Sequence, residues 1–537
     1  MTWIVAPIFV SDADATRAQI QAARREGADS VELRCDRASP ETMETLLGRP
    51  EIRQTRLIVT IRPVWEGGFY RGGEQDRLQL LALACRWLTS ADFLDVELAA
   101  WNQSDKFRSV LTDKITPFES PAGNGPRLII STHDFSGAPP NLENHFAALA
   151  AVRAASLLKI AFRARNVHDA FAALRLYDHA RRLDPRPLVS IAMDEAGRIS
   201  RLLAAKFGAA FTFATPADQT GTAPGQPRIY DLKNVYRFDS QRTDWSVFAL
   251  AGWPVSHSIS PAIHNAGFRE LGFPGVYVPL PIEPGWEAFV AAVDAARNFP
   301  ELRLAGLSVT IPHKQNAFRY VRERAGSLDE TARRIRAINT IFFHPDGSIG
   351  GINSDWPGAR DALTAALGIA PEELGGYEVA VIGAGGAARA IVAGLASYGA
   401  AVAIYNRTLA HAQELAREFG GETGRVRAAP LEEFPHSVCQ VLINCTPVGM
   451  TPNTQALPIP DTLPLHRGMV VFDTVYNPRQ TRLLKLAREH GARAVEGIEM
   501  LWRQAAAQFE GFTLRPAPLE VLRRAALAAL AEQGRQE

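Results

Sequence analysis

The stretch Tyr377-Glu-Val-Ala-Val-Ile382, followed at once by Gly383-Ala-Gly-Gly-Ala-Ala-Arg389, decides the fold of the C-terminal half. A short apolar run leads into a glycine-rich turn and a helix-like segment, and a second apolar run follows at residues 401–405. Strand, glycine turn, helix and strand in this order predict the opening unit of a parallel α/β sheet.

This unit predicts a dinucleotide site, because glycines in such a turn allow a pyrophosphate to approach the N-terminus of the following helix. An Asp or Glu at the end of the second strand would favour NAD, but the sequence there is Asn406-Arg407-Thr408. A guanidinium suits a 2′-phosphate, so NADP(H) is the expected cofactor. The expected cofactor-binding residues of the turn are Gly383, Ala384, Gly385, Gly386 and Ala387.

Length and charge limit the rest of the chain. At about 150 residues per domain, 537 residues predict roughly three to four domains. With 58 basic and 57 acidic residues, the net charge is +1, which argues against nucleic-acid or membrane partners bound through a broad basic surface. The four cysteines lack CxxC or zinc spacing, so no metal is expected. The N-terminus shows no targeting pattern, which makes the cytoplasm the expected location.

The first 235 residues alternate short apolar runs with helix-like stretches. Between the sixth and seventh runs, residues 167–183 carry apolar side chains at helical spacing. Eight β/α units predict a closed (β/α)8 barrel, with two open sheets as the alternative. The eight predicted strands lie near residues 3–9, 29–34, 56–62, 92–98, 127–133, 156–162, 187–193 and 209–214.

Polar residues follow several of these runs, at the strand ends where barrel active sites form. Lys159 interrupts an apolar strand, where an amine must be desolvated or paired. A desolvated lysine can attack a ketone and form a Schiff base, although a lysine at a strand end can also simply reach solvent. His133 on the adjacent strand could transfer protons, and Glu66 could orient its ring. Three arginines could hold a carboxylate, namely Arg34, Arg62 and Arg201.

Together these motifs resemble type I 3-dehydroquinate dehydratase over about residues 3–235. The resemblance implies a Schiff base between Lys159 and the ketone of 3-dehydroquinate, with His133 as the proton-transfer group and Glu66 positioning it. It also implies that Glu32, Arg34, Arg62, Arg201, Thr222 and Gln226 bind the substrate; Thr222 replaces the usual serine. The segments that carry it are Glu32-Leu33-Arg34, Glu66-Gly67-Gly68, His133-Asp134-Phe135, Lys159-Ile160-Ala161, Ile199-Ser200-Arg201 and Ala223-Pro224-Gly225-Gln226.

A second ordered set resembles shikimate dehydrogenase over about residues 247–530. Hydroxyls at Ser258 and Ser260 could bind a carboxylate, and Lys314 near Asp355 could relay a proton to an alkoxide, unless the two form an ordinary salt bridge. The resemblance implies that Lys314 and Asp355 are catalytic and that Gly497 joins the NADP site. It implies that shikimate is bound by Ser258, Ser260, Thr310, Asn339, Tyr476 and Gln504. The family's usual Asn-Thr-Asp-Gly is here Asn353-Ser354-Asp355-Trp356, a change expected to affect loop shape more than chemistry.

The resemblances imply that the first half dehydrates 3-dehydroquinate to 3-dehydroshikimate and that the second half reduces 3-dehydroshikimate to shikimate with NADPH. The product of the first reaction is the substrate of the second, so we expect a fused enzyme of the shikimate pathway. The expected domains are a barrel at 1–235, a linker at 236–246, a shikimate-binding α/β domain at 247–370 completed by helices in 497–537, and a Rossmann domain at 371–496. Three alternatives stay open at this point. The chain could prefer quinate, an aminoshikimate or NAD, it could be a non-catalytic metabolite sensor, or one half could be inactive.

Overall fold

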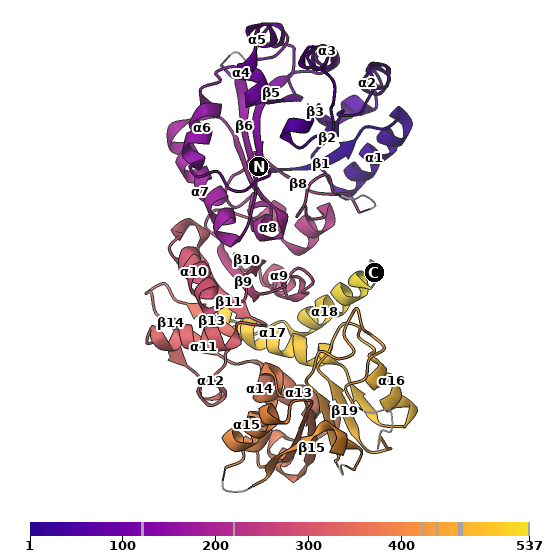
Figure 1. The fold of residues 1–537 in the computed structure, drawn as a ribbon, viewed down its shortest axis with the longest axis vertical. Coiled ribbons are helices and arrows are strands. Elements are labelled where there is room, and N and C mark those ends of the chain that lie inside the picture. The colour runs from indigo at the N-terminus through magenta and orange to yellow at the C-terminus, as the bar shows by residue number, and fades with distance from the viewer. Residues whose placement is uncertain (120–122, 218–220, 422–423, 437–438, 460–464, 535–537) are drawn as a thin grey trace. The chain divides into compact units, whose positions relative to one another are not determined.

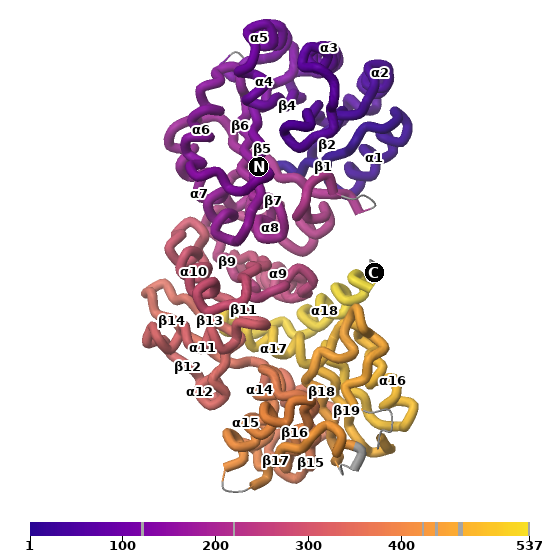
Figure 2. Tube along the Cα trace, in the orientation of Figure 1, coloured from indigo at the N-terminus to yellow at the C-terminus, as the bar shows by residue number. Residues whose placement is uncertain are grey.

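The computed structural model describes residues 1–119, 123–217, 221–421, 424–436, 439–459 and 465–534. The chain forms two compact units. The first is built mainly from residues 1–246, and the second contains residues 247–277, 284–290 and 304–537. Figure 1 shows the elements of each unit, and Figure 2 follows the path of the chain through them. In the described part of the chain, no helix combines the length and the apolar content needed to cross a bilayer.

The first unit contains an eight-stranded parallel sheet in the order β7-β6-β5-β4-β3-β2-β1-β8. Ala210, just before β8, donates its N–H to the carbonyl of Leu188 in β7, so the two edges of the sheet meet. This near-closed barrel confirms the predicted fold and excludes two open sheets. The strands are β1 (Trp3–Phe9), β2 (Ser30–Arg34), β3 (Arg56–Thr60), β4 (Phe93–Glu97), β5 (Arg127–Asp134), β6 (Ala155–Arg163), β7 (Leu188–Met193) and β8 (Phe211–Phe213).

Helices connect successive strands and cover the outside of the barrel (Figure 1). The predicted helix at 167–183 is α7 (Val167–Leu183), which begins where the Asn166 side chain accepts the N–H of His168. The apolar positions that carry the helical spacing are buried from Val167 to Ala180, as that spacing predicts, whereas Leu183 at the end of the helix is 66% exposed. The others are α1 (Ala13–Glu26), α2 (Pro40–Leu47), α3 (Glu74–Cys85), α4 (Leu98–Gln103), α5 (Asp105–Thr112), α6 (Leu142–Ala150) and α8 (Asp194–Leu202).

The segment expected to be a polar linker, residues 236–246, is folded onto the first unit. Phe238 is 1% exposed, and the Gln241 side chain donates to the carbonyls of Leu202 and Tyr236. The buried amine of Lys206 donates to the carbonyls of Thr243 and Trp245. The segment is therefore held on the barrel by Phe238, Gln241 and its own backbone carbonyls, while Asp239, Ser240 and residues 242–244 remain exposed.

A mixed sheet follows in the order β10-β9-β11-β13-β14-β12. Its strands are β9 (Ser246–Gly252), β10 (Gly275–Pro281), β11 (Leu304–Val309), β12 (Ser327–Leu328), β13 (Thr340–Phe343) and β14 (Ile349–Ile352), and its helices are α9 (Ser260–Glu270), α10 (Trp286–Arg297), α11 (Lys314–Glu323) and α12 (Glu330–Ile335). Most of these elements belong to the second unit, whereas residues 278–283 and 291–303, which include parts of β10 and α10, are grouped with the first. The C-terminal helices α17 (Gly497–Thr513) and α18 (Leu519–Gln533) share a core with α9. The last three residues of the predicted C-terminal range lie outside the described residues.

A parallel sheet in the order β17-β16-β15-β18-β19-β20 follows. The quoted stretch forms β15 (Glu378–Ile382), α14 (Gly386–Ser397) and β16 (Ala401–Asn406), which is the predicted opening unit. Helix α13 (Asp355–Leu367) leads into this sheet and packs on α14 and α17. The remaining elements are α15 (Leu409–Phe419), β17 (Val426–Pro430), β18 (Val441–Asn444), β19 (Val470–Asp473), α16 (Arg482–Glu489) and β20 (Arg493–Val495).

Candidate active sites

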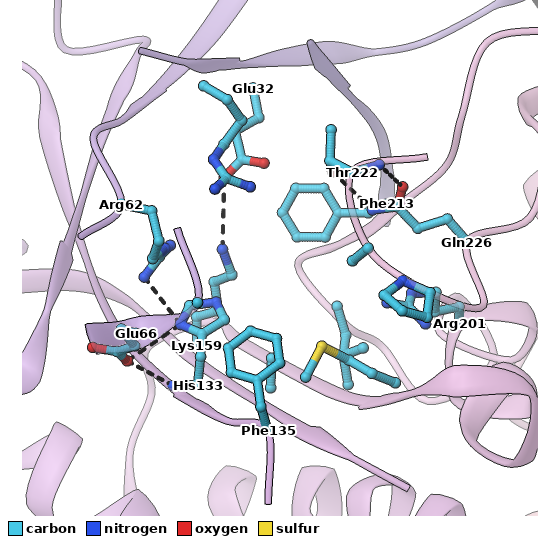
Figure 3. Close-up of a pocket in the computed structure, with 17 residues that line it drawn as sticks. Glu32, Arg62, Glu66, His133, Phe135, Lys159, Arg201, Phe213, Thr222 and Gln226 are labelled. Carbon is cyan, nitrogen blue, oxygen red and sulfur yellow. Dashed lines mark hydrogen bonds and ion pairs between the residues drawn. The ribbon is translucent and has the colours of Figure 1, made fainter. Parts of the chain in front are cut away.

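A cavity of about 90 Å³ lies at the carboxyl ends of the barrel strands (Figure 3). All nine site residues expected in this half line it: Glu32, Arg34, Arg62, Glu66, His133, Lys159, Arg201, Thr222 and Gln226. Parallel strands end at the same edge of a barrel, which is why residues far apart in sequence meet there. The rest of the wall is mostly apolar and includes Phe135, Ile191, Met193 and Phe213.

The amine of Lys159 lies in this cavity and is paired with carboxylates. Lys159 is 3% exposed, and its Nζ lies 2.8 Å from Asp95 Oδ2 and 3.7 Å from Glu32 Oε1. Strand register aligns it with Ser131, so His133, two residues further along β5, faces the same interior one layer closer to the mouth. The ring of Phe213 covers the amine, with its centroid 4.8 Å from Nζ.

His133 is held through one ring nitrogen and its backbone. Glu66 Oε1 accepts the backbone N–H of His133 at 2.7 Å and lies 3.3 Å from Nδ1, while Arg62 Nη1 lies 3.0 Å from Nδ1. Burial, and then the cations Arg62 and Lys159, hold the pKa of His133 well below its ordinary value. The imidazole is therefore neutral at physiological pH and able to accept a proton. Burial also raises the pKa of Glu66 to about 8.

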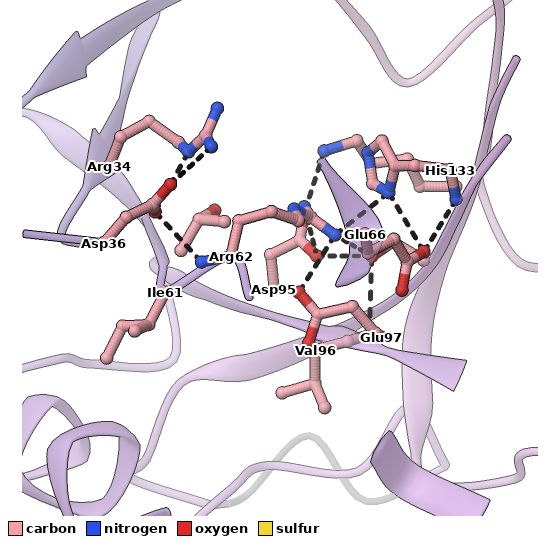
Figure 4. Close-up of polar contacts among 12 residues, drawn as sticks. Arg34, Asp36, Ile61, Arg62, Glu66, Asp95, Val96, Glu97 and His133 are labelled. Atoms are coloured by element: carbon pink, nitrogen blue, oxygen red, sulfur yellow. Dashed lines mark hydrogen bonds and ion pairs between the residues drawn. The ribbon is translucent and has the colours of Figure 1, made fainter. Parts of the chain in front are cut away.

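The three arginines differ in what they bind; Figure 4 shows Arg34 and Arg62, and Figure 3 shows Arg201. Arg34 is bound to the buried carboxylate of Asp36, with Nη2 2.6 Å from Oδ2. Arg62 forms ion pairs with Asp95 and Glu97, at 3.1 and 3.0 Å, in addition to its contact with His133. Arg201 is 2% exposed, and neither Nε nor Nη1 has a hydrogen-bond partner among the described residues. Burial lowers the pKa of Arg201 to about 10, so a substrate anion beside it would be strongly favoured.

Asp95 and Glu97 are buried residues beside the cavity that the sequence analysis does not predict. Both lie on β4 with no exposed surface, and Asp95 bridges Lys159 and Arg62. Those two cations outweigh the effect of burial and hold the pKa of Asp95 below its ordinary range. Two carboxylates in the apolar run Phe93-Leu-Asp-Val-Glu97 gave the same signal as Lys159, a charge in a buried strand, and could have been found by it.

In the second unit, four of the expected residues form one hydrogen-bonded group. Lys314 Nζ lies 2.6 Å from Asp355 Oδ2, and the other oxygen of that carboxylate accepts from Asn339 Nδ2 at 3.0 Å. Asn339 Nδ2 also lies 3.4 Å from Gln504 Oε1. Lys314 and Asp355 are the first residues of α11 and α13, so two helix starts bring the pair together.

The remaining expected substrate residues follow strand ends or begin helices. Ser258 Oγ donates to Ser260 Oγ at 3.1 Å, where Ser260 begins α9. Thr310 follows β11, and its N–H donates to Ala251 at the end of β9. Tyr476 follows β19 and is partly buried against the core shared by α9 and α17. No hydrogen bond among the described residues joins Thr310 or Tyr476 to the lysine–aspartate group.

The glycine-rich turn fits a dinucleotide. Gly383 has φ +108°, a conformation that favours glycine, and Gly385 caps α14 with open space where a side chain would project. Gly385 and Gly386 are exposed, so the free N–H groups of the first helical turn are accessible to a phosphate. Arg407 and Thr408 are exposed after β16, whereas Asn406 donates to the carbonyl of Thr408. Gly497 begins α17 where a Cβ would collide with the carbonyls of Thr474 and Val475.

Comparisons with known proteins match both halves of the chain to known enzyme families. The profile of type I 3-dehydroquinase matches residues 4–243, that of the shikimate dehydrogenase substrate-binding domain matches 250–341, and that of shikimate/quinate 5-dehydrogenase matches 365–449. The bifunctional 3-dehydroquinate dehydratase/shikimate dehydrogenase of Arabidopsis thaliana is 35% identical over 96% of this chain and 83% of its own length.

The second half has further relatives. The NADP(+) shikimate dehydrogenase of Methanosarcina mazei is 40% identical over 53% of this chain and 98% of its own length. The shikimate 5-dehydrogenase of Thermus thermophilus, solved with NADP(H) and shikimate, is 33% identical over 53% of this chain and 100% of its own, with a TM-score of 0.46. The predicted α/β fold class, the two enzyme classes and the NADP cofactor are confirmed. The chain belongs to the family of bifunctional 3-dehydroquinate dehydratase/shikimate dehydrogenases.

Proposed function

We propose that the barrel dehydrates 3-dehydroquinate through Lys159 and that the second unit reduces the resulting 3-dehydroshikimate to shikimate with NADPH. The observation that carries the first step is a buried lysine facing the same cavity as a neutral histidine. The Lys159 amine attacks the substrate ketone and forms an imine with loss of one water. The imine accepts the electron pair when His133 removes a proton from the neighbouring carbon, and the β-hydroxyl then leaves as water. Hydrolysis of the imine restores the amine.

The two partners of His133 Nδ1 suit a group that both takes and returns a proton. A guanidinium only donates, so the Arg62 contact favours the tautomer with the proton on Nε2, which can protonate the leaving hydroxyl. The Glu66 contact favours the proton on Nδ1, which leaves Nε2 free as a base. Arg62 therefore acts on His133, and Arg201, whose donors are free, is the residue that binds the substrate carboxylate. Glu32, Thr222 and Gln226 line the same cavity, and we assign them to the substrate hydroxyls.

In the second unit, Lys314 donates the proton that the new hydroxyl group needs, and Asp355 keeps the ammonium in place. Bound NADPH supplies the hydride. Asn339 Nδ2 contacts the Asp355 carboxylate and the Gln504 side chain. Asn339 and Gln504 therefore orient the carboxylate and the substrate together. Ser258 and Ser260 bind the substrate carboxylate. The dinucleotide is held by the turn from Gly383 to Ala387, by residues 406–408 and by Gly497.

The test uses the full chain with two matched variants. When wild type is given 3-dehydroquinate and NADPH, the absorbance of NADPH should fall as it is oxidised. Lys159→Ala should lose this activity but still reduce added 3-dehydroshikimate, whereas Lys314→Ala should release 3-dehydroshikimate and fail to reduce it. Borohydride should trap substrate on wild type and not on Lys159→Ala. A Lys159→Ala chain that still consumed 3-dehydroquinate would exclude the imine.

A cytoplasmic location stays a prediction, since the Arabidopsis relative is chloroplastic by its name. Preference for shikimate over quinate is also part of the proposal, and a panel of polyhydroxy acids with both nicotinamide cofactors tests it. The complete residue sets in both sites favour an enzyme over a sensor, because a sensor has no need of an aligned amine and base.

A further inference from the structure

Helix α13 places a bulky residue directly beside the catalytic carboxylate. Its first residue is Asp355, which pairs with Lys314, and its second is Trp356, which is 6% exposed. The indole lies against Gly394 in the middle of α14, where an added Cβ would fall 2.0 Å from Trp356 Cδ2. Tyr398, the residue that follows α14, has its ring centroid 6.0 Å from that of Trp356. Only a glycine at position 394 leaves room for the indole, and we call this contact of Trp356 with Gly394 the seat of the indole.

The seat connects the proton donor to the cofactor-binding turn. Helix α14 begins at Gly386, and a Cβ on that glycine would lie 3.9 Å from Lys314 Cδ, so the lysine stem runs past the start of the helix. The contacts therefore lead back to their starting point. Lys314 pairs with Asp355, the next residue Trp356 contacts Gly394, and the first residue of the helix that contains Gly394 lies beside Lys314. Because Gly386 and Gly394 belong to one continuous helix, a displacement of α14 at Gly394 also displaces its first turn.

Helix α13 also packs closely against α17. A Cβ on Gly358 would lie 2.9 Å from the backbone nitrogen of Gln504, so α13 and α17 approach closely at a proposed substrate residue. The Trp356 ring also lines a cavity of about 290 Å³ together with Arg334, Arg360 and Tyr398. Although it borders this cavity, Trp356 is only 6% exposed and belongs to a buried core cluster that also contains Ala359 and Leu363 of α13 and Ala393 of α14, so both helices hold the indole.

We propose that Trp356 is a positioning residue for the reductase. Its indole, seated on Gly394, sets the distance between the Lys314–Asp355 pair and the first turn of α14, and so places the proton donor against the bound dinucleotide. This inference rests on the proposed role of Lys314. Since carbon atoms in contact lie about 3.5–4.0 Å apart, a methyl group on Gly394 would displace the ring by roughly 1.5 Å. Misplacement by about 1 Å can lower a catalytic rate roughly 100-fold.

The experiment is a double-mutant cycle on the full chain with Trp356→Ala and Gly394→Ala. Each single variant should lower the reductase kcat at least about tenfold, while KM for NADPH and for 3-dehydroshikimate changes by less than roughly threefold. In the Trp356→Ala chain, a methyl group introduced at position 394 meets no indole, so adding Gly394→Ala should lower kcat no further. Trp356→Phe should recover part of the rate.

Two readouts separate positioning from loss of folded protein. Rates are expressed per NADPH-binding site counted by nicotinamide fluorescence, and the dehydratase activity of the same chain should be unchanged in every variant. The solvent deuterium isotope effect on kcat should rise in both single variants, because transfer of the proton from a displaced Lys314 becomes slower. Additive losses in the cycle, or an unchanged kcat in Gly394→Ala, would overturn the positioning role. An inactive wild-type reductase would instead overturn the proposed function.

Discussion

Arg201→Met should weaken substrate binding and at the same time stabilise the barrel. The guanidinium is 2% exposed with Nε and Nη1 unpaired among the described residues, and burial lowers its pKa from 12.5 to about 10. At about 1.4 kcal/mol per pKa unit, keeping this charge in the free enzyme costs roughly 3 kcal/mol at neutral pH. Methionine retains the apolar stem and removes the charge. Allowing for lost packing, we expect the free energy of unfolding to rise by about 1–2 kcal/mol.

Binding should change in the opposite direction, because the unpaired donors are the ones a carboxylate would satisfy. Hydrogen bonds to charged groups contribute about 1.5–3 kcal/mol each, so losing two should lower the dehydratase kcat/KM by a factor of roughly 100 or more. Arg34→Met is the matched control at the same cavity. Its guanidinium is paired with Asp36, so its removal leaves a buried carboxylate with fewer partners and should destabilise the barrel by at least about 1 kcal/mol.

The two units can be followed separately through their cysteines. Cys35 is 1% exposed in the barrel and Cys439 is 5% exposed in the second unit, so urea-dependent thiol labelling read by mass spectrometry gives one unfolding midpoint for each. Arg201→Met should raise the Cys35 midpoint and leave that of Cys439 unchanged. A lower Cys35 midpoint, or a kcat/KM close to that of wild type, would show that Arg201 is a structural residue and not a pre-formed anion site.

Three further predictions follow from the titratable groups and the nucleotide turn. Because burial raises the pKa of Glu66 to about 8, its folded form keeps a proton that the unfolded chain releases near pH 4.5. The free energy of unfolding of wild type should therefore fall relative to that of Glu66→Gln as the pH rises from 4.5 to 8, measured in urea, and a difference that does not change with pH would contradict this. His264 is buried and stacked on Tyr277, and burial lowers its pKa to about 3. Its contribution to stability is present above pH 6.5 and is lost as the pH falls from 6.5 toward 3, so His264→Phe should keep the second unit folded at lower pH, measured by Cys439 labelling. Arg407→Ala should raise KM for NADPH about tenfold and leave KM for NADH unchanged; an equal change in both would remove Arg407 from the 2′-phosphate site.

Much of the fold could be predicted because its signals are local. The helix at 167–183 follows from the spacing of its apolar residues, and β15–α14–β16 follows from a glycine turn between two apolar runs. Lys159 was found because a charge inside an apolar strand needs an explanation in any fold. The segment 236–246 was predicted as a linker because its polar side chains look alike whether they face solvent or, as Gln241 does, buried carbonyl groups.

The sequence by itself determined the order of the elements, the two families and most of the residues that line the two candidate sites, since these depend on side-chain type and spacing along the chain. Only the tertiary structure decided which charges are paired. It places Asp36 on Arg34 and Asp95 between Lys159 and Arg62, and it leaves Arg201 with free donors. It also seats Trp356 on Gly394, a residue of the next helix. Pairing and packing depend on distances between strands and helices, and these are set only when the chain has folded.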